Sequence, residues 1–438
     1  MQRASPPPAH SAPGLQRTLS FWQVTVSGVG IVIGAGIYVL IGDAAKEAGA
    51  AVWLSFALSA VLSALTGLSY AELAGMFPVA GAEYEFARRA FNDFVGFMAG
   101  WTMVAGNIVA AGAVSIGFAH YLRHFFEVDQ RVASLALLSV LTLIIAAGVQ
   151  RSIWLSVVLA VLQVGGLLLV IAVGAPHVGS RSLLEDGTVA GVLSASALVF
   201  FAFIGFDEVV TLSEETRDAE HVIPRALLTA LAISAALYML VGITAVSVVG
   251  ADALGASDRP LALVIQHDWG GRASGIVAFI ALASTTNTTL LVLTAASRLL
   301  FGMSRNGALP RQFATVGRRA HSPYVAAGLA FVIAALFALV GSIGFIASVT
   351  DFAVYAIFLA VNGSLIVLRL RLPDAARTFR VPLRLGRVPV TPLAGIATVL
   401  LMLAYLEPRA WIVGGAALVA GVAVWLLYAQ RHVSRAGT

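Results

Sequence analysis

Two stretches of this 438-residue sequence carry groups that could bind a small charged ligand. In the first, Gly34, Ala35 and Gly36 lie inside an uncharged run over residues 21–42. Glycine in a helix interior costs about 1 kcal/mol relative to alanine, so we expect the helix to unwind here. The N–H groups freed at Ala35, Gly36 and Ile37 would then favour an anion such as a carboxylate. The alternative is close helix packing through small residues.

The second stretch covers residues 200–208 and places Gly205 just before two acids, Asp207 and Glu208. An acid at the start of a helix is stabilising by about 0.3–1 kcal/mol, which accounts for at least one of the pair. A carboxylate at membrane depth can instead gain and lose a proton as part of the function. Both interpretations stay open for these two residues.

The composition predicts that both stretches lie in a membrane protein. The chain is 59% hydrophobic and 11% charged, whereas soluble proteins are about 25% charged. A membrane-crossing helix needs about 20 apolar residues. Twelve runs are near or above that length: residues 21–43, 50–76, 94–122, 132–149, 153–175, 190–212, 224–249, 273–300, 323–342, 346–368, 389–406 and 410–429. We therefore predict an all-α polytopic membrane protein with twelve transmembrane helices.

Positive charge orients the predicted helices. With the N-terminus in the cytoplasm, 20 of the 27 basic residues fall on the inner side and 7 on the outer side, as the positive-inside rule requires. Both termini are then cytoplasmic, in a multi-pass protein of the cytoplasmic membrane. This placement explains the net charge of +5 without nucleic acid. Residues 1–16 are interpreted as part of a disordered tail rather than a signal peptide.

Nothing in the sequence indicates an enzyme, a metal or a cofactor. His120, His124 and His267 lack the spacing of metal ligands. The sequence contains no cysteine for thiol chemistry, and neither a nucleophile–base constellation nor a phosphate-binding loop stands out.

The two expected breaks fall in the first and sixth predicted helices. Interrupted helices at matching positions of two halves are typical of transporters built from inverted repeats. We therefore predict a first repeat over residues 21–189 and a second over residues 190–371. Two further helices would occupy residues 372–430, and short cytoplasmic tails residues 1–20 and 431–438.

Three segments resemble the amino acid–polyamine–organocation transporter superfamily, in its bacterial amino acid permease and cationic amino acid transporter branches. They are GVGIVIGAGIYVLIG (residues 28–42), YAELAGMFPVAGAEYEFARRAF (70–91) and FFAFIGFDEVVTLSEETRDAEHVIPRAL (200–227), supported by SRLLFGMSRNGALP (297–310). The resemblance implies a leucine-transporter-type 5+5 inverted repeat with broken helices 1 and 6. Helices 1, 2, 6 and 7 would form a moving bundle and helices 3, 4, 8 and 9 a scaffold, with helices 5 and 10 as gating arms.

The resemblance also implies how such a site would hold a zwitterionic amino acid. The ammonium group would bind the carbonyls of Val32, Phe201 and Ile204, opposite the N–H groups that bind the carboxylate. Phe206 matches an aromatic residue that covers the ligand in relatives, although a core-facing phenylalanine is the alternative. Asp207 matches an acid of the relatives and is the candidate to carry a coupling proton.

Two departures from the relatives bear on cargo and coupling. Several relatives place a carboxylate in helix 3 where this chain has Gly106, followed by Asn107, so a cationic side chain would lack a partner. Proton-coupled relatives place a lysine where this chain has Gln163, which can hydrogen-bond the first break but cannot titrate. A sodium route through Thr294 is a further alternative.

Three other polar features need an interpretation. In the eighth predicted helix a polar run over residues 284–289 covers every face. Hydroxyls bonding back to helix carbonyls account for part of it, and we expect Asn287 or Thr288 to approach the substrate side chain. Glu72 is interpreted as a structural residue that holds the cytoplasmic loop, and Asp351 has no assigned role.

The leading interpretation is a secondary active or facilitative transporter of neutral amino acids that works by alternating access. One alternative keeps the fold and changes the cargo, as a cationic amino acid or polyamine exchanger. The other is a membrane sensor or partner subunit that binds an amino acid without moving it. The expected partners are an amino acid, the lipid bilayer and, if transport is coupled, a proton; the oligomeric state is left open.

Overall fold

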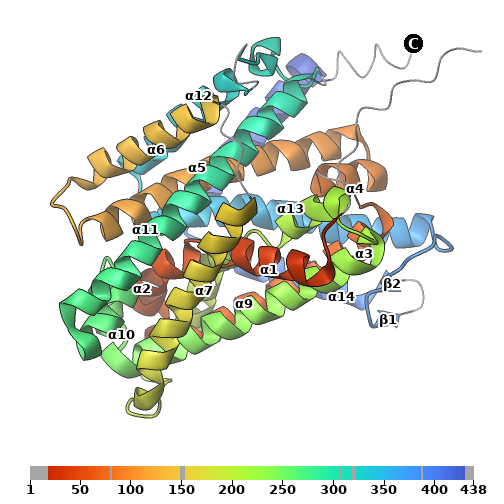
Figure 1. Ribbon diagram of the computed structural model, residues 1–438. Helices are drawn as coiled ribbons and strands as arrows, with labels where there is room; N and C mark the ends of the chain where they lie inside the picture. The colour runs from red at the N-terminus through yellow and green to blue at the C-terminus, as the bar shows by residue number, and fades with distance from the viewer. Residues whose placement is uncertain are drawn as a thin grey trace, which may run out of the picture.

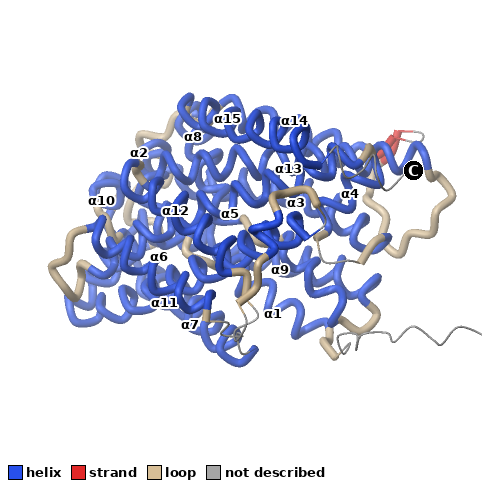
Figure 2. The backbone as a smooth tube through the Cα atoms, turned by 90° about the horizontal axis from the view of Figure 1, so that it is seen from above, coloured by secondary structure: helices blue, strands red, loops and turns tan. Residues whose placement is uncertain are grey.

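The computed structural model describes residues 18–78, 81–147, 153–305, 307–317, 322–385 and 388–429. The predicted terminal tails lie outside these residues, apart from residues 18–20. The described chain is a bundle of helices with one small hairpin (Figures 1 and 2). The hairpin pairs β1 (Arg384–Leu385) with β2 (Val388–Pro389) in an antiparallel register.

The helices begin and end close to the predicted apolar runs. The α-helices are α1 (Phe21–Val32), α2 (Gly36–Ala48), α3 (Val52–Met76), α4 (Ala82–Ala90), α5 (Asp93–Leu122), α6 (Gln130–Ala146), α7 (Ile153–Gly174), α8 (Val189–Val199), α9 (Ala219–Val249), α10 (Ala251–Ala256), α11 (Pro260–Arg305), α12 (Tyr324–Val340), α13 (Ile343–Arg371), α14 (Val390–Ala404) and α15 (Pro408–Val424). Shorter 3₁₀ turns are η1 (Gly49–Ala51), η2 (Ala175–His177), η3 (Phe200–Phe203), η4 (Asp207–Glu215) and η5 (Arg311–Ala314), and η6 (Trp425–Ala429) is a π-turn.

The described helices are those of a membrane protein. Eight segments among the described residues are long and apolar enough to cross a membrane, with α2 and α3 counted as one. Four further apolar helices, α1, α6, α12 and α14, are shorter. Each of the twelve predicted runs contains a helix, but a count of twelve crossings and a 5+5 repeat remain predictions.

Helix ends follow from local sequence. At the start of α1, Ser20 and Gln23 form a capping box, with the Ser20 N–H donating to Gln23 Oε1 at 2.9 Å. The side chain of Asn92 caps α5 by accepting from the Val95 N–H at 2.9 Å. Gly270, with φ of 77°, interrupts α11 and separates a short first part, residues 260–269, from a long second part.

Two apolar clusters of buried side chains meet at the expected breaks. The first cluster includes Val32 and Ala202, and is built largely from α1–α3, α7–α9 and the C-terminal part of α13. The second includes Ala35 and Phe201, and is built largely from α5, α6 and α12 with parts of α11 and α13. Helices α1, α7 and α9 lie side by side in Figure 1, while Figure 2 places α14 and α15 on the opposite side of the bundle. Each break therefore lies at a boundary between two packed units.

Candidate functional site

The first break separates α1 from α2. At its start the Ile33 N–H donates to Val29 O and the Gly34 N–H donates to Val32 O, both at 2.8 Å. The Ala35 N–H then donates to Oγ1 of Thr288, on α11, at 3.2 Å. The first N–H groups of α2 have no partner within their own helix. The expected unwinding is therefore present, and a hydroxyl from another helix already contacts the freed backbone.

The second break follows η3. Gly205 has φ of 110°, a conformation that favours glycine because a Cβ would clash with the backbone. Its N–H donates to Oδ1 of Asp207 at 3.1 Å. Asp207 and Glu208 begin η4, so both acids lie at the start of the second half of this interrupted helix.

The two breaks touch each other. A Cβ placed on Gly36 would lie 2.5 Å from Cα of Ala202, which is closer than two such carbons can approach. A Cβ placed on Gly205 would lie 3.1 Å from Cγ2 of Ile31. Glycine at position 36 thus allows the start of α2 to pack directly on the backbone of η3.

A cavity of about 410 Å³ lies against both breaks. Nine of the predicted site residues line it: Val32, Gly34, Ala35, Gly36, Phe201, Ile204, Asp207, Asn287 and Thr288. Further walls come from α5, α11 and α13 and include Met103, Gly106, Asn107, Ala110, Leu291, Val354 and Ile357. Backbone donors, carbonyl groups and an apolar wall therefore converge on one space.

Three predicted site residues do not line this cavity. Ile37 is buried in the first apolar cluster. Phe206 has an exposed fraction of 0%, and its ring centroid lies 5.6 Å from Tyr70 and 5.4 Å from Phe358. In this conformation Phe206 packs in the core rather than over the cavity, and the aromatic ring that lines the cavity belongs to Phe201.

Gln163, the third of these residues, lies behind the first break. The amide orientation that satisfies both of its ends places the nitrogen 2.6 Å from Ile33 O and 3.2 Å from Gly30 O. In that orientation the oxygen accepts from the Ser284 hydroxyl at 3.3 Å. Gln163 therefore holds the unwound backbone from α7 with a group that has no titratable proton.

Tyr238 is not among the site residues expected from the sequence. Its hydroxyl lies 2.8 Å from Val32 O and 2.9 Å from Ala202 O, so it reaches a carbonyl of each break. A tyrosine inside an apolar helix usually needs a hydrogen-bond partner, which is the only signal that the sequence offered. Val32 O, predicted to bind an ammonium group, already accepts from this hydroxyl and from the Gly34 N–H.

Some polar residues of α11 bond back to carbonyls of their own helix, and some line the cavity. Thr285 and Thr289 donate to carbonyls four residues earlier, at 2.8 Å in each case, as hydroxyls inside helices commonly do. Thr294 lines the cavity, but its hydroxyl also bonds back, to Leu290 O at 2.6 Å. Asn287 and Thr288 of the same helix also line the cavity.

Charged residues also line the cavity. Besides Asp207, its lining contains Glu208 and Glu215 of η4 and Arg298 of α11. Arg298 is ten residues beyond Thr288, or about 15 Å along the helix. Nearby, in α4 and outside the predicted membrane-crossing runs, burial raises the pKa of Glu83 to about 8, and the negative charge of Asp207 adds to this effect.

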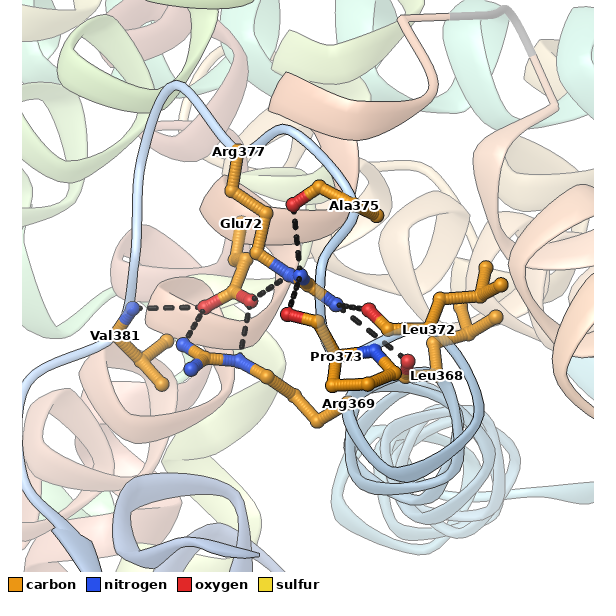
Figure 3. Close-up of polar contacts among 8 residues, drawn as sticks. All are labelled: Glu72, Leu368, Arg369, Leu372, Pro373, Ala375, Arg377 and Val381. Carbon is orange, nitrogen blue, oxygen red and sulfur yellow. Dashed lines mark hydrogen bonds and ion pairs between the residues drawn. The ribbon is translucent and has the colours of Figure 1, made fainter. Parts of the chain in front are cut away.

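Glu72 has the structural environment expected for it (Figure 3). Its buried carboxylate accepts from Arg369 at 2.6 and 2.5 Å and from the Val381 N–H at 2.8 Å, and Nε of Arg377 lies 2.9 Å away. These contacts tie α3 to the end of α13 and to the loop that follows it. Asp351, by contrast, is fully buried, and neither of its carboxylate oxygens has a hydrogen-bond partner within the described part of the chain.

His124 and His267 each take part in a polar pair. His124 Nδ1 lies 2.9 Å from Nη1 of Arg259, and His267 Nδ1 lies 2.7 Å from Oδ1 of Asp268. Within the described ranges, no group of three or more histidine, cysteine, aspartate or glutamate side chains could hold a metal ion.

Comparison with known proteins agrees with this architecture. A family model described as "Amino acid permease" matches residues 19–428. The branched-chain amino acid permease BcaP of Bacillus subtilis is 29% identical over 95% of this chain and 94% of its own length. The methylthioribose transporter of the same organism is also 29% identical, over 95% and 94% respectively. The vacuolar cationic amino acid transporter 4 of Arabidopsis thaliana is 28% identical over 82% of this chain and 64% of its own length.

Proposed function

The chain belongs to the amino acid permease family, and on that premise we propose that it transports neutral amino acids with apolar side chains by alternating access. The family and its relatives are transporters rather than enzymes. The chain is a multi-pass membrane protein. We place it in the cytoplasmic membrane with both termini inside, on the strength of the arginine distribution.

The observation that carries this proposal is the convergence of two unlike breaks on one cavity. The N–H groups at the start of α2 attract a carboxylate, because a helix N-terminus carries partial positive charge. The second break presents carbonyl groups and the acids of η4, which attract an ammonium group. A zwitterionic amino acid offers one partner to each break.

The cavity wall favours a neutral side chain. The part formed by α5 and α13, which includes Met103, Gly106 and Val354, contributes no charged residue. A lysine or arginine side chain would be desolvated there without a counter-charge, which is costly. The similarity to a branched-chain amino acid permease supports the same cargo class.

The rival cargoes follow from the other relatives. A cationic amino acid would need an acid in the α5 wall, and Gly106 and Asn107 supply none. A sugar such as methylthioribose has no carboxylate for the start of α2. A sensor that binds without moving its ligand would need the same two breaks.

The selectivity test is uptake of labelled leucine, arginine and methylthioribose into proteoliposomes. We expect leucine to be taken up and to exchange in counterflow, which a sensor would not support. Binding of leucine without uptake or counterflow would favour the sensor, and arginine uptake without leucine uptake would favour the cationic exchanger.

A substitution in the α5 wall makes this test specific. A Cβ on Gly106 would lie 3.4 Å from Cβ of Ala353, so a side chain fits with little movement. Gly106→Glu should lower leucine uptake and introduce arginine binding, whereas Gly106→Gln, of similar size, should lower leucine uptake without arginine binding. Equal behaviour of the two variants would contradict the assignment of this wall to the substrate side chain.

A further inference from the structure

Tyr238 lies where the two breaks meet. It belongs to α9, which packs against α1. Its hydroxyl oxygen lies 2.8 Å from the carbonyl of Val32, the last residue of α1, and 2.9 Å from the carbonyl of Ala202, in η3. Tyr238 does not line the cavity, so it acts on both breaks from behind.

The ring of Tyr238 is fixed by packing. Its centroid lies 5.1 Å from that of Phe203 in an edge-to-face arrangement and 5.8 Å from that of Phe56. The side chain has an exposed fraction of 0%. Because α3 and η3 both hold the ring, the hydroxyl cannot leave one carbonyl without disturbing a packed core.

The two carbonyls share a single donor. A neutral tyrosine hydroxyl has one proton, so Val32 O and Ala202 O compete for it and are held at nearly equal distances. Close by, Gly36 packs on the backbone of Ala202, where a Cβ would lie 2.5 Å from Cα. The start of α2 and the second break are therefore joined twice, by a direct contact and by Tyr238.

We propose that Tyr238 is a positioning residue that sets the spacing between the carboxylate-binding start of α2 and the ammonium-binding second break. This inference rests on the proposed function, since only a ligand that bridges both breaks requires that spacing. A ligand with a carboxylate and no ammonium group uses the first break alone. Its affinity should therefore be insensitive to the loss of the Tyr238 hydroxyl.

The experiment compares leucine with 4-methylpentanoate, which is leucine without its ammonium group. Inhibition constants for both are measured by displacement of labelled leucine from the purified full-length protein. Tyr238→Phe should weaken leucine about 5–10-fold, the usual worth of one buried hydrogen bond, and leave 4-methylpentanoate within about twofold of wild type. The preference for leucine over its deamino analogue should fall by the same factor.

Tyr121→Phe is a matched control. Tyr121 is also fully buried, and its hydroxyl donates to a carbonyl of the same interrupted helix, Tyr38 O, at 2.7 Å. That carbonyl belongs to the third residue of α2 and, as in any α-helix, points along the helix away from the break. Tyr121→Phe should therefore leave the preference between the two ligands unchanged.

The outcomes separate the inference from the function. An unchanged preference for leucine in Tyr238→Phe would overturn the inference. This holds whether both affinities stay the same or both weaken equally, which would indicate a general loosening. If Tyr238→Phe does not fold, Phe203→Leu removes part of the ring packing instead, and should lower the preference in the same direction. If the wild-type protein binds neither leucine nor any other amino acid, the proposed function itself fails.

Discussion

The two breaks look alike in sequence, yet the backbone N–H groups at each break have different hydrogen-bond acceptors. At the first break the Ala35 N–H meets a hydroxyl from a distant helix, Thr288 Oγ1, at 3.2 Å, and the next N–H groups of α2 have no partner in their helix. At the second break the Gly205 N–H meets the carboxylate of Asp207, two residues further along the same segment, at 3.1 Å. One helix start is thus available to a ligand, and the other is occupied by its own acid.

This difference gives the site a direction. An anion is favoured at the start of α2, and is repelled where Asp207 and Glu208 lie. A cation has the opposite preference. We therefore expect a bound amino acid to place its carboxylate toward α2 and its ammonium group toward η3 and η4.

The largest effect should come from closing the first break. Gly36→Val should weaken leucine binding by more than about 100-fold, because any side chain at this position collides with Ala202 and forces the breaks apart. Binding is measured on the purified variant after its monodispersity is checked. Gly328→Val on α12, where a Cβ would meet nothing within 4 Å, should behave like wild type. Wild-type affinity in Gly36→Val would show that the first break serves packing alone.

A smaller effect should come from neutralising the second break. Asp207→Asn should weaken leucine about 10-fold, since it removes negative charge near the expected ammonium position. It should also flatten any pH dependence of uptake. Counterflow and net uptake in liposomes, with and without a pH gradient, measure both effects.

The control for this second prediction is Gln163→Ala. It should weaken transport without altering its pH dependence, because the amide has no titratable proton. Gradient-driven accumulation that persists in Asp207→Asn would assign the coupling proton to another group.

Thr288→Val should have a more modest effect on the first break. The Thr288 hydroxyl accepts from the Ala35 N–H, so its own proton is left to donate to a ligand carboxylate. The variant should weaken leucine and 4-methylpentanoate equally, by about 3–5-fold. Thr289→Val removes a hydroxyl that only bonds back to Thr285 O and should change neither affinity. Weakening of leucine alone would place Thr288 at the ammonium end instead.

The smallest effect concerns Glu83, beside the acids of the second break. Its pKa is raised from 4.5 to about 8 by burial and by Asp207. The unfolded chain therefore releases this proton at lower pH than the folded protein does, and stability falls as pH rises from about 4.5 to 8. Glu83→Gln should remove this slope and unfold a few degrees higher than wild type at pH 8, with little difference at pH 4.5. Parallel melting curves of wild type and Glu83→Gln at all pH values would show that folding does not raise the pKa of Glu83.

Part of the site could be predicted because its cause is local. Glycine destabilises a helix wherever it stands, so the break at Gly34 to Gly36 was expected from the chain alone. Gly205 and the two acids after it marked the second break for the same reason. The twelve apolar runs located the helices, because hydrophobic length depends only on neighbouring residues.

Other parts could not be predicted, because their partners are remote. Glu72 was assigned a structural role, but its partners Arg369 and Arg377 are about 300 residues away in sequence. Phe201 rather than Phe206 lines the cavity. The ring of Phe206 packs against Tyr70 and Phe358 and so lies in the core.

The sequence by itself determined the class of protein, the positions of its helices and the two breaks, because burial in lipid and helix propensity act on short segments. Only the tertiary structure decided which donors and acceptors those breaks keep free. Thr288 and Tyr238 reach the breaks from α11 and α9, and hydrogen bonds of about 3 Å require contacts that no local pattern specifies. The direction in which the site is expected to bind an amino acid is therefore a consequence of packing between helices that are distant in the chain.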